Sequence, residues 1–275
     1  MKKSKRYISR SILLVVTIIS FVGISTFAQK SDGLKVQRFF LIGDSTVNNS
    51  SGDFRGWGNV LGEYFDPAKA VVINRARGGR SSRTFITEGL WDQVVNELKL
   101  GDVLLIQFGH NDGGSIDKEK ARGSLKGVGD ETKTVVVEAT GKTETVRTYG
   151  SYMSQYISDA LPKKVTVVVL SPVPRNIWKD GKVVRASADY GKWARQVAEK
   201  SGTQFVDLNE IVAAKFESVG EERSKIYFTN IDHTHTSLIG AKLNAESVVQ
   251  GLLKLEQLKI KSYLLDPKGF VASGK

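Results

Sequence analysis

Short, nearly continuous runs of apolar and β-branched residues recur along this chain, separated by longer stretches with helical periodicity. Continuous apolar character is typical of parallel strands that are buried on both faces. The runs are Arg38–Gly43, Ala70–Asn74, Asp102–Gly109, Lys164–Ser171 and, more weakly, Thr203–Leu208. The helical stretches are Trp57–Phe65, Leu90–Leu98, Tyr149–Ala160, Ala186–Lys200 and Leu238–Leu258. This alternation predicts a doubly wound α/β fold, in which helices cover both faces of a central parallel sheet.

The first 28 residues have the layout of an export signal. Five cations and no acid fall in residues 1–10, an apolar run follows at Ile12–Ile24, and small residues lead to Ala28. This order predicts a cleaved signal peptide at residues 1–28 and a secreted or periplasmic protein. The alternative is an uncleaved membrane anchor, but an apolar run of about 13 residues is shorter than the roughly 20 that a spanning helix needs.

The rest of the chain fits one α/β domain, which we expect to span residues 35–262. Residues 113–148 interrupt the pattern because they are rich in Gly, Lys and Thr. Two β-branched runs, Thr134–Glu138 and Thr143–Arg147, indicate a small hairpin in this insertion, over the crevice of the sheet. Residues 266–275 are expected to form a flexible tail. The sequence contains no cysteine, which excludes a cysteine nucleophile, a thiolate metal site and disulfides.

Polar motifs follow the first three predicted strands, at the edge where a doubly wound sheet forms its binding crevice. They are Asp44-Ser45, Arg77-Gly78-Gly79-Arg80 and His110-Asn111-Asp112. Ser45 is a candidate nucleophile, but a serine hydroxyl needs a base within hydrogen-bond reach and a third group that orients the base. The alternative is that Asp44 and Ser45 cap the next helix, since both residue types are good N-caps.

The motif Asp232-His233-Thr234-His235 can supply that base, because the chain contains only three histidines and two of them lie here. Asp232 and His235 are three residues apart, a spacing that puts both side chains on one face of a turn. The carboxylate can then hold the Nδ1–H of His235 and leave Nε2 free for Ser45, whereas His233 should point elsewhere. The alternative is that these residues cap a helix that starts near Thr236.

Acyl transfer also needs N–H donors aimed at the oxygen that becomes negative in the transition state, and one such donor can be worth about 3–4 kcal/mol. Gly79 lacks a Cβ, so its backbone N–H can approach the reacting atoms closely. The side-chain amide of Asn111 and the backbone N–H of Ser45 are two further candidates. The alternatives are that Gly79 only forms a turn and that Asn111 only satisfies its own loop.

Four of these motifs, in this order, resemble the sequence blocks of the SGNH (GDSL-type) hydrolases. They are Gly43-Asp44-Ser45-Thr46, Gly79 within Arg77–Arg83, Gly109-His110-Asn111-Asp112 and Asp232-His233-Thr234-His235. The first three also resemble, within that superfamily, the rhamnogalacturonan acetylesterase group. The resemblance covers most of residues 39–253.

The resemblance implies a three-layer α/β/α sandwich with a central parallel sheet, similar to flavodoxin. It implies that Ser45 is the nucleophile, that Asp232 and His235 are the orienting acid and the base, and that Ser45, Gly79 and Asn111 form the oxyanion hole. The implied reaction is hydrolysis of acetyl esters on the galacturonate residues of pectic rhamnogalacturonan, without a metal or a cofactor.

The charge of the chain agrees with an acidic substrate. The formal net charge of +11 falls to near +6 without the five cations of the signal peptide, and a cationic surface attracts acidic polymers. A guanidinium can bind a uronate carboxylate through two parallel hydrogen bonds, unless it pairs with a local acid. The arginines expected on loops at the crevice are Arg55, Arg77, Arg80 and Arg83. We expect substrate contacts from Arg80, Arg83, His110 and Trp178, and we assign Trp57 to the core because it falls in an amphipathic stretch.

Other functions use the same residues. A lipase-like or aryl esterase would need an extended apolar channel, which these polar loops do not indicate, and acetylated xylan is a further substrate. A divalent metal could be held by suitable ligand types at Asp44, Asp112, Asp232, His233 and His235. A non-catalytic polysaccharide-binding protein is compatible with the fold, but it has no use for a complete catalytic set. We expect neither nucleic acid nor, after signal cleavage, a membrane as a partner.

Overall fold

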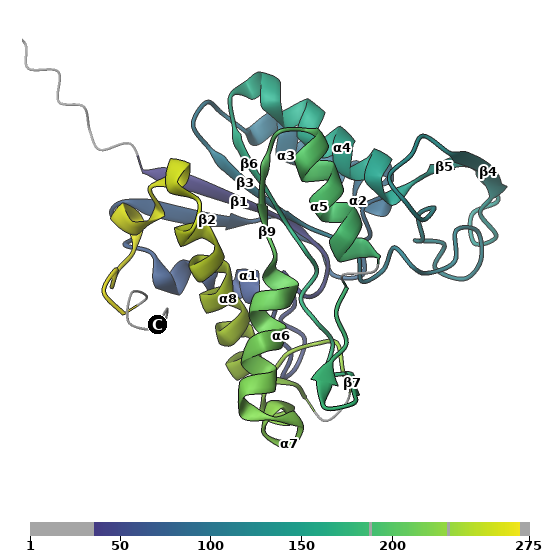
Figure 1. Cartoon of the computed structure of the whole chain (residues 1–275). Coiled ribbons are helices and arrows are strands. Elements are labelled where there is room, and N and C mark those ends of the chain that lie inside the picture. Colours follow the sequence, from purple (N-terminus) through teal and green to yellow (C-terminus); the bar gives the residue numbers. More distant parts are fainter. Residues whose placement is uncertain (1–35, 187–188, 230–231, 270–275) are drawn as a thin grey trace, which may run out of the picture. The chain divides into compact units, whose positions relative to one another are not determined.

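The computed structural model describes residues 36–186, 189–229 and 232–269. Its centre is a sheet of five parallel strands in the order β2-β1-β3-β6-β9 (Figure 1). The strands are β1 (Gln37–Gly43), β2 (Ala70–Asn74), β3 (Val103–Gln107), β6 (Thr166–Leu170) and β9 (Gln204–Val206). Each coincides with a predicted strand to within a few residues at its ends. The predicted signal peptide, residues 1–28, lies outside the described residues.

Most of the longer helices that flank the sheet lie within predicted stretches, whereas the helix Leu208–Val219 was not predicted and the stretch Trp57–Phe65 forms only short turns. The longer ones are α3 (Leu90–Glu97), α4 (Tyr149–Ala160), α5 (Tyr190–Lys200), α6 (Leu208–Val219) and α8 (Leu238–Leu253). Single turns form α1 (Trp57–Val60), α2 (Thr84–Thr87) and α7 (Glu221–Ser224). Short 3₁₀ segments are η1 (Leu61–Tyr64), η2 (Leu161–Lys163), η3 (Lys225–Tyr227), η4 (Glu256–Leu258) and η5 (Ile260–Tyr263). The predicted helix Leu238–Leu258 is therefore shorter than expected, with its last residues in η4.

Alternate residues of the central strands point to opposite faces of the sheet, as the pleat of a strand requires. In β1, Phe39 and Leu41 pack in a cluster with residues of α1, α6 and α8. Phe40 and Ile42 pack in a second cluster with residues of α3, α4 and α5. Trp57 lies fully buried in the first cluster, as its position in an amphipathic stretch predicted. Two helical layers thus enclose the sheet, which confirms the predicted three-layer α/β/α sandwich.

The strand order places a crevice at the carboxyl ends of β1 and β3. The chain passes from β1 to β2 on one side and then returns to β3 on the other, so the connections diverge between β1 and β3. Ligands of open α/β sheets bind at such a switch point. Gly43 lies opposite Gln107 in the register, so both strands end at the same level. The residues that follow the two strands therefore meet at one edge of the sheet.

The predicted hairpin in residues 113–148 is present as the antiparallel pair β4 (Thr132–Val136) and β5 (Thr143–Arg147). It projects beyond α2 and α4, away from the helices α6 and α8 (Figure 1). A second, unexpected hairpin consists of β7 (Trp178–Lys179) and β8 (Lys182–Val183). It follows β6 and stands beside α6, so it adds to the rim of the crevice.

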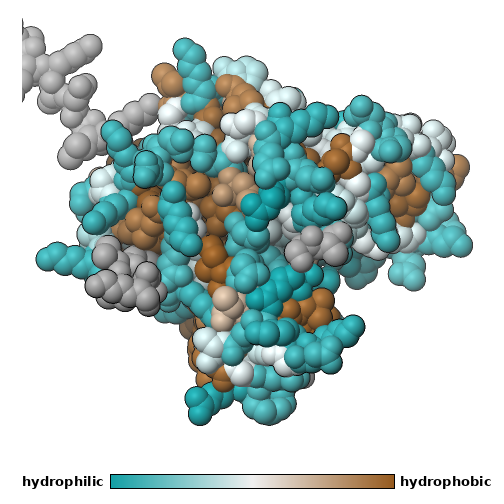
Figure 2. All heavy atoms as spheres, in the orientation of Figure 1, coloured by the Kyte–Doolittle hydropathy of each residue, from teal (hydrophilic) through white to brown (hydrophobic). Residues whose placement is uncertain are grey.

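The face of the molecule shown in Figure 2 is mainly hydrophilic. Hydrophobic residues emerge on the face shown in Figure 2 as patches separated by hydrophilic side chains. Among the residues that the structure describes, no helix combines the length and the hydropathy needed to cross a membrane.

Candidate active site

Ser45, His235 and Asp232 form a continuous chain of hydrogen bonds. The Nε2 atom of His235 lies 2.8 Å from the Oγ of Ser45, and its Nδ1 lies 2.6 Å from the Oδ2 of Asp232. An ionised carboxylate only accepts hydrogen bonds, so Nδ1 carries the hydrogen and Nε2 is free to accept the proton of the serine hydroxyl. The structure therefore brings together the three residues that the sequence predicted, in the geometry that activates a serine.

Ser45 follows the end of β1, and tight packing around this end holds it in position. A Cβ on Gly43 would lie 2.5 Å from the Cγ2 of Val47 and 2.6 Å from the carbonyl oxygen of Gln107, so only glycine fits there. The chain then turns, and the next helix, α1, begins only at Trp57. The alternative in which Ser45 caps a helix is therefore wrong.

Asp232 organises the turn that carries the base. Its Oδ1 accepts the backbone N–H groups of Thr234 and His235, at 2.7 and 2.6 Å. Partial burial acts to raise the pKa of this carboxyl, but the hydrogen bonds from the ring and backbone of His235 and from Thr234 lower the pKa overall. Ser237, not Asp232, is the N-cap of α8, since its Oγ accepts the N–H of Gly240. The capping alternative for Asp232 and His235 is therefore wrong as well.

The site is open to solvent on one side. The side chains of His235 and Asp232 are 28% and 30% exposed. The ring of Phe54 lies against His235, with 5.2 Å between ring centroids, and fixes one face of the imidazole. The arrangement can thus receive an ester carried by a large molecule, because the described residues leave the catalytic side chains partly exposed.

The second motif, which contains the predicted oxyanion donor Gly79, packs against Ser45. A Cβ on Gly78 would be 3.6 Å from the Cβ of Ser45, so the second motif packs directly on the first. Gly79 has a φ of 79°, in the left-handed region that favours glycine. Within the described residues, the N–H groups of Ser45 and Gly79 donate to no other protein group. The Nδ2 of Asn111 donates one hydrogen to the Arg80 carbonyl at 2.8 Å, which leaves its second N–H for a ligand.

A buried hydrogen-bonded pair, Asp44 and His110, supports the loop that carries Ser45. The Oδ2 of Asp44 lies 3.1 Å from the Nδ1 of His110, whose Nε2 lies 2.9 Å from the Val173 carbonyl. A carbonyl oxygen can only accept, so the histidine donates to it. Asp44 is fully buried; burial acts to raise its pKa, but His110 and Thr46 lower the pKa overall. His110 was expected to contact substrate, and this is a correction: its side chain is 5% exposed and both ring nitrogens have protein partners.

Arg83 was also expected to contact substrate, and this prediction is wrong. Its side chain is 1% exposed and forms an ion pair with Glu144 of β5. Its Nη1 also donates to the carbonyls of Ile116 and Gly123, so the guanidinium is fully occupied inside the protein. The side chain turns inward, toward a carboxylate that lies 61 positions along the chain.

Arg80, Arg77 and Trp178 differ in how far their side chains are bound within the protein. Arg80 lies at the surface and pairs with Glu88, and its Nη1 donates to the Gly78 carbonyl. Arg77 is exposed and has no side-chain partner among the described residues. Trp178 is half-buried in β7, where its Nε1 donates to Asn176 at 2.8 Å and its side chain packs against the first core cluster.

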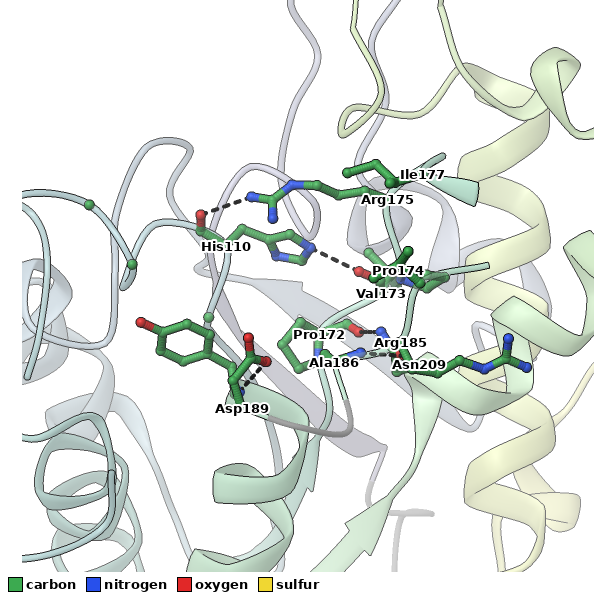
Figure 3. Close-up of a pocket in the computed structure, with 15 residues that line it drawn as sticks. His110, Pro172, Val173, Pro174, Arg175, Ile177, Arg185, Ala186, Asp189 and Asn209 are labelled. Carbon is green, nitrogen blue, oxygen red and sulfur yellow. Dashed lines mark hydrogen bonds between the residues drawn. The ribbon is translucent and has the colours of Figure 1, made fainter. Parts of the chain in front are cut away.

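Arg175 joins the catalytic turn to the third motif, a role that sequence reasoning missed. Its Nε donates to the Oγ1 of Thr234 at 3.0 Å. Its Nη2 donates to the carbonyl of His110 at 3.1 Å, a bond that Figure 3 shows. The signal was available, because Arg175 follows β6 as the other motifs follow their strands. Beside it opens a pocket of about 430 Å³, whose walls include Pro172, Val173, Ile177 and Val184. His110 and Arg175 also line this pocket, which lies at the carboxyl ends of β3 and β6.

Asp112 is a second buried carboxyl, directly after Asn111. It accepts hydrogen bonds from the backbone and hydroxyl of Ser82 and from the hydroxyl of Ser124 at 3.1 Å. Burial raises its pKa to about 6, the serine hydrogen bonds oppose this, and the neighbouring carboxylate of Asp44 adds to it. Asp112 thus fastens the second motif and the insertion to the third motif.

The structure separates the residues of the metal-site alternative. Asp44 pairs with His110, Asp112 binds serines, and Asp232 binds His235. In the described ranges, no group of three or more histidine and carboxylate side chains is placed to hold a metal ion. The five residues of that alternative therefore do not form one ligand set.

Comparison with known sequences finds a matching family model and several similar proteins. The model of the GDSL-like lipase/acylhydrolase family matches residues 41–236. A rhamnogalacturonan acetylesterase of Emericella nidulans is 32% identical over 217 residues, which cover 79% of this chain and 85% of that protein. The rhamnogalacturonan acetylesterase RhgT of Bacillus subtilis is 28% identical over 247 residues, which cover 84% of this chain and 95% of that protein.

Solved structures share the fold. The crystal structure of protein YxiM from Bacillus subtilis matches 81% of this chain with a TM-score of 0.65 and 25% identity, and the chain spans 58% of that structure. The acetylxylan esterase Axe2 from Geobacillus stearothermophilus matches 80% of this chain and 96% of its own, with a TM-score of 0.51 and 16% identity. At this identity the second match speaks for the fold alone.

Proposed function

The chain belongs to the GDSL-like lipase/acylhydrolase family and is a carboxylic ester hydrolase, and from this premise we propose that it removes acetyl groups from an acidic pectic polysaccharide. The observation that carries the proposal is the unbroken hydrogen-bonded series from Ser45 through His235 to Asp232. A serine so placed is a nucleophile, and the relatives at 32% and 28% identity are named for acetyl-ester hydrolysis.

In the proposed mechanism, the Oγ of Ser45 attacks the acetyl carbonyl carbon while the Nε2 of His235 takes the hydroxyl proton. The carbonyl oxygen becomes an oxyanion, which the N–H groups of Ser45, Gly79 and Asn111 stabilise. When the intermediate collapses, the sugar oxygen leaves with the proton from His235, and the acetyl group remains on the serine. His235 then deprotonates a water, which attacks the acetyl-serine; acetate departs and the proton returns to Ser45. Asp232 keeps the imidazole oriented and stabilises its charge in both halves.

Three features support a polymeric, acidic substrate. The catalytic side chains are partly exposed, and a pocket of about 430 Å³, lined by His110 and Arg175, opens at the same carboxyl edge of the sheet and offers room for further sugar residues. Arg77, next to Gly78, is an exposed cation without a protein partner among the described residues. The cationic charge of the chain raises the local concentration of a polyanion.

We also propose that the protein acts outside the cytoplasm. The support is the cationic, then apolar, then small-residue order of residues 1–28. A plant polysaccharide is too large to reach an enzyme inside a cell, so export suits the proposed substrate.

Acetate release from acetylated rhamnogalacturonan, measured beside acetylated xylan at equal acetyl content, tests the substrate. The proposal expects a kcat/KM at least about tenfold higher on the acidic polymer; a preference for xylan would contradict the pectic assignment and leave the acetylesterase assignment intact. Comparing acetyl and octanoyl esters of one alcohol tests the acyl group. Faster turnover of the octanoyl ester would instead indicate a lipase-like enzyme.

A further inference from the structure

Arg122 lies at the proposed oxyanion hole, although it belongs to the insertion of residues 113–148. Its Nη1 donates to the carbonyl oxygen of Gly79 at 3.3 Å. The same nitrogen would lie 3.7 Å from a Cβ on Gly79, so the guanidinium occupies the space beside this glycine. The side chain also passes over the third motif, because a Cβ on Gly114 would lie 3.7 Å from its Cγ.

The backbone around Arg122 is strained. Glu119 and Ala121 have φ values of 51° and 42°, in the left-handed region that residues with a Cβ seldom adopt. A Cβ on Gly123 would lie 2.0 Å from the carbonyl oxygen of Gly114, so the two ends of this loop pass each other backbone against backbone. Such conformations persist only where the surroundings impose them, and they are concentrated at functional sites.

Buried groups impose this conformation on both sides of Arg122. Ser124 donates its backbone N–H and its hydroxyl to Asp112, which ties the loop to the third motif. Arg83 holds the carbonyls of Ile116 and Gly123 from within the protein, and Glu144 of β5 neutralises its charge. The hairpin and the second motif thus fix Arg122 beside Gly79 before any substrate binds.

The charge of Arg122 is unpaired in the described part of the protein. No carboxylate of a described residue lies within ion-pair distance, and the weak bond to the Gly79 carbonyl is its one hydrogen bond there. Arginines 38, 75, 80, 83, 185 and 195 all pair with carboxylates. Arg122 is also half-buried, so its charge is less well hydrated than that of a surface arginine. A half-buried guanidinium held in place without an anion is prepared to receive one.

We propose that Arg122 binds the carboxylate of a uronic acid residue in the substrate and thereby selects acetyl esters on acidic sugars. This inference rests on the proposed function and adds the residue that recognises the carboxylate of the substrate. No described residue accepts a hydrogen bond from the Nε or Nη2 of Arg122, so these atoms can donate the two parallel hydrogen bonds that a carboxylate accepts. Because the guanidinium adjoins Gly79, the carboxylate it binds belongs to the acetylated sugar or to its direct neighbour.

The test compares two small substrates that differ only in charge: an acetylated methyl galacturonoside with a free carboxylate, and the same compound with the carboxylate methyl-esterified. The readout is the ratio of their kcat/KM values. The wild-type enzyme should prefer the free acid. Arg122→Gln should lower kcat/KM on the free acid by about 10- to 100-fold, the range for a charge-assisted hydrogen bond, and should bring the ratio close to one. Arg122→Lys should keep part of the preference, since it keeps the charge and loses the planar fork.

Arg223→Gln is the matched control, because Arg223 is an exposed arginine of α7 without a side-chain partner among the described residues. It should leave the ratio at the wild-type value, and thermal unfolding should show that both Gln variants are folded. If Arg122→Gln loses activity equally on both substrates, Arg122 only holds the Gly79 peptide. If the variant keeps the preference for the free acid, another group recognises the carboxylate. Either result overturns this inference but leaves the proposed function standing. A wild-type enzyme that deacetylates only neutral sugars would contradict the proposed function as well.

Discussion

The Oγ of Ser45 and the Nε2 of His235 lie 2.8 Å apart although 190 positions separate them in the sequence. Ser45 follows β1, a strand of the central sheet. His235 precedes α8, which packs on the sheet beside α1. Their approach thus depends on the whole sandwich. Thr236, next to His235, reinforces it, since its hydroxyl donates to the Arg55 carbonyl at 2.7 Å.

Ser45→Ala should abolish ester hydrolysis and leave the fold intact. Loss of the nucleophile of a serine hydrolase lowers kcat by about 10⁶-fold, whereas removing one partly exposed hydroxyl changes stability by about 1 kcal/mol or less. Acetate release and circular dichroism measure the two effects. Ser50→Ala, at an exposed serine five positions away, is the control and should retain full activity. Turnover by the Ser45→Ala variant above a hundredth of the wild-type rate would refute the nucleophile assignment.

Asp232→Asn should lower kcat by about 10³- to 10⁴-fold with a much smaller effect on KM. An amide at this position can keep one oxygen for the backbone N–H groups of Thr234 and His235, but its NH₂ would then face Nδ1 and stabilise the wrong tautomer of the histidine. Steady-state kinetics on a soluble acetyl ester separate kcat from KM. A variant with a normal kcat would show that the carboxylate does not orient the base.

Asn111→Ala should reduce kcat by about 10²- to 10³-fold, the effect of removing one oxyanion donor. The amide also donates to the Arg80 carbonyl, so a small loss of stability should accompany the change. Asn96→Ala, in the last turn of α3 and away from the carboxyl edge of the sheet, provides the comparison and should leave kcat unchanged. An unchanged kcat for Asn111→Ala would show that the amide serves only its loop.

The sequence predicted those features that depend on local pattern. The five strands were recognisable because the runs are buried on both faces, and the spacing of Asp232 and His235 placed both side chains on one side of a turn. The helix α6 was overlooked, although Leu208, Val212 and Phe216 follow its buried face, because its start overlaps the weak run at Thr203–Leu208. The pattern of residue types does not determine the residue at which a strand ends and the next helix begins.

The roles of Arg83 and His110 could not be predicted, because their partners come from distant segments. Glu144 reaches Arg83 only through the β4–β5 hairpin, and Val173 reaches His110 only through the pairing of β3 with β6. A charged residue in a loop motif is as compatible with an internal ion pair as with a ligand contact. Only the tertiary structure decides which of the two it forms.

Arg83→Met should destabilise the protein by about 3 kcal/mol, because it leaves the carbonyls of Ile116 and Gly123 and the carboxylate of Glu144 without their cation. Denaturant unfolding measures this change. Arg77→Met removes an exposed arginine of the same motif and should change stability by less than about 0.5 kcal/mol. Equal stability of the two variants would mean that the buried network contributes nothing to folding.

The buried carboxyl of Asp112 should make stability depend on pH with a sign opposite to that of most acids. Its pKa is about 6 in the folded protein and near the ordinary 3.8 in the unfolded chain. Below pH 4 both states hold the proton, and the contribution of this group to stability is complete. As the pH rises from 4 to 6 the unfolded chain releases the proton first, so about 3 kcal/mol of stability is lost by pH 7.

Other carboxyls, such as Asp232 with its lowered pKa, act in the opposite direction, so the comparison must isolate Asp112. Asp112→Asn provides this, because an amide has no titration in the range and any cost of its imperfect hydrogen bonds to Ser82 and Ser124 is independent of pH. The unfolding free energy of the wild type, minus that of the variant, should fall by about 3 kcal/mol between pH 4 and pH 7. A constant difference for Asp112→Asn would mean that the carboxyl keeps an ordinary pKa in the folded protein, and hence that the three serine hydrogen-bond donors and the solvent fully offset its burial.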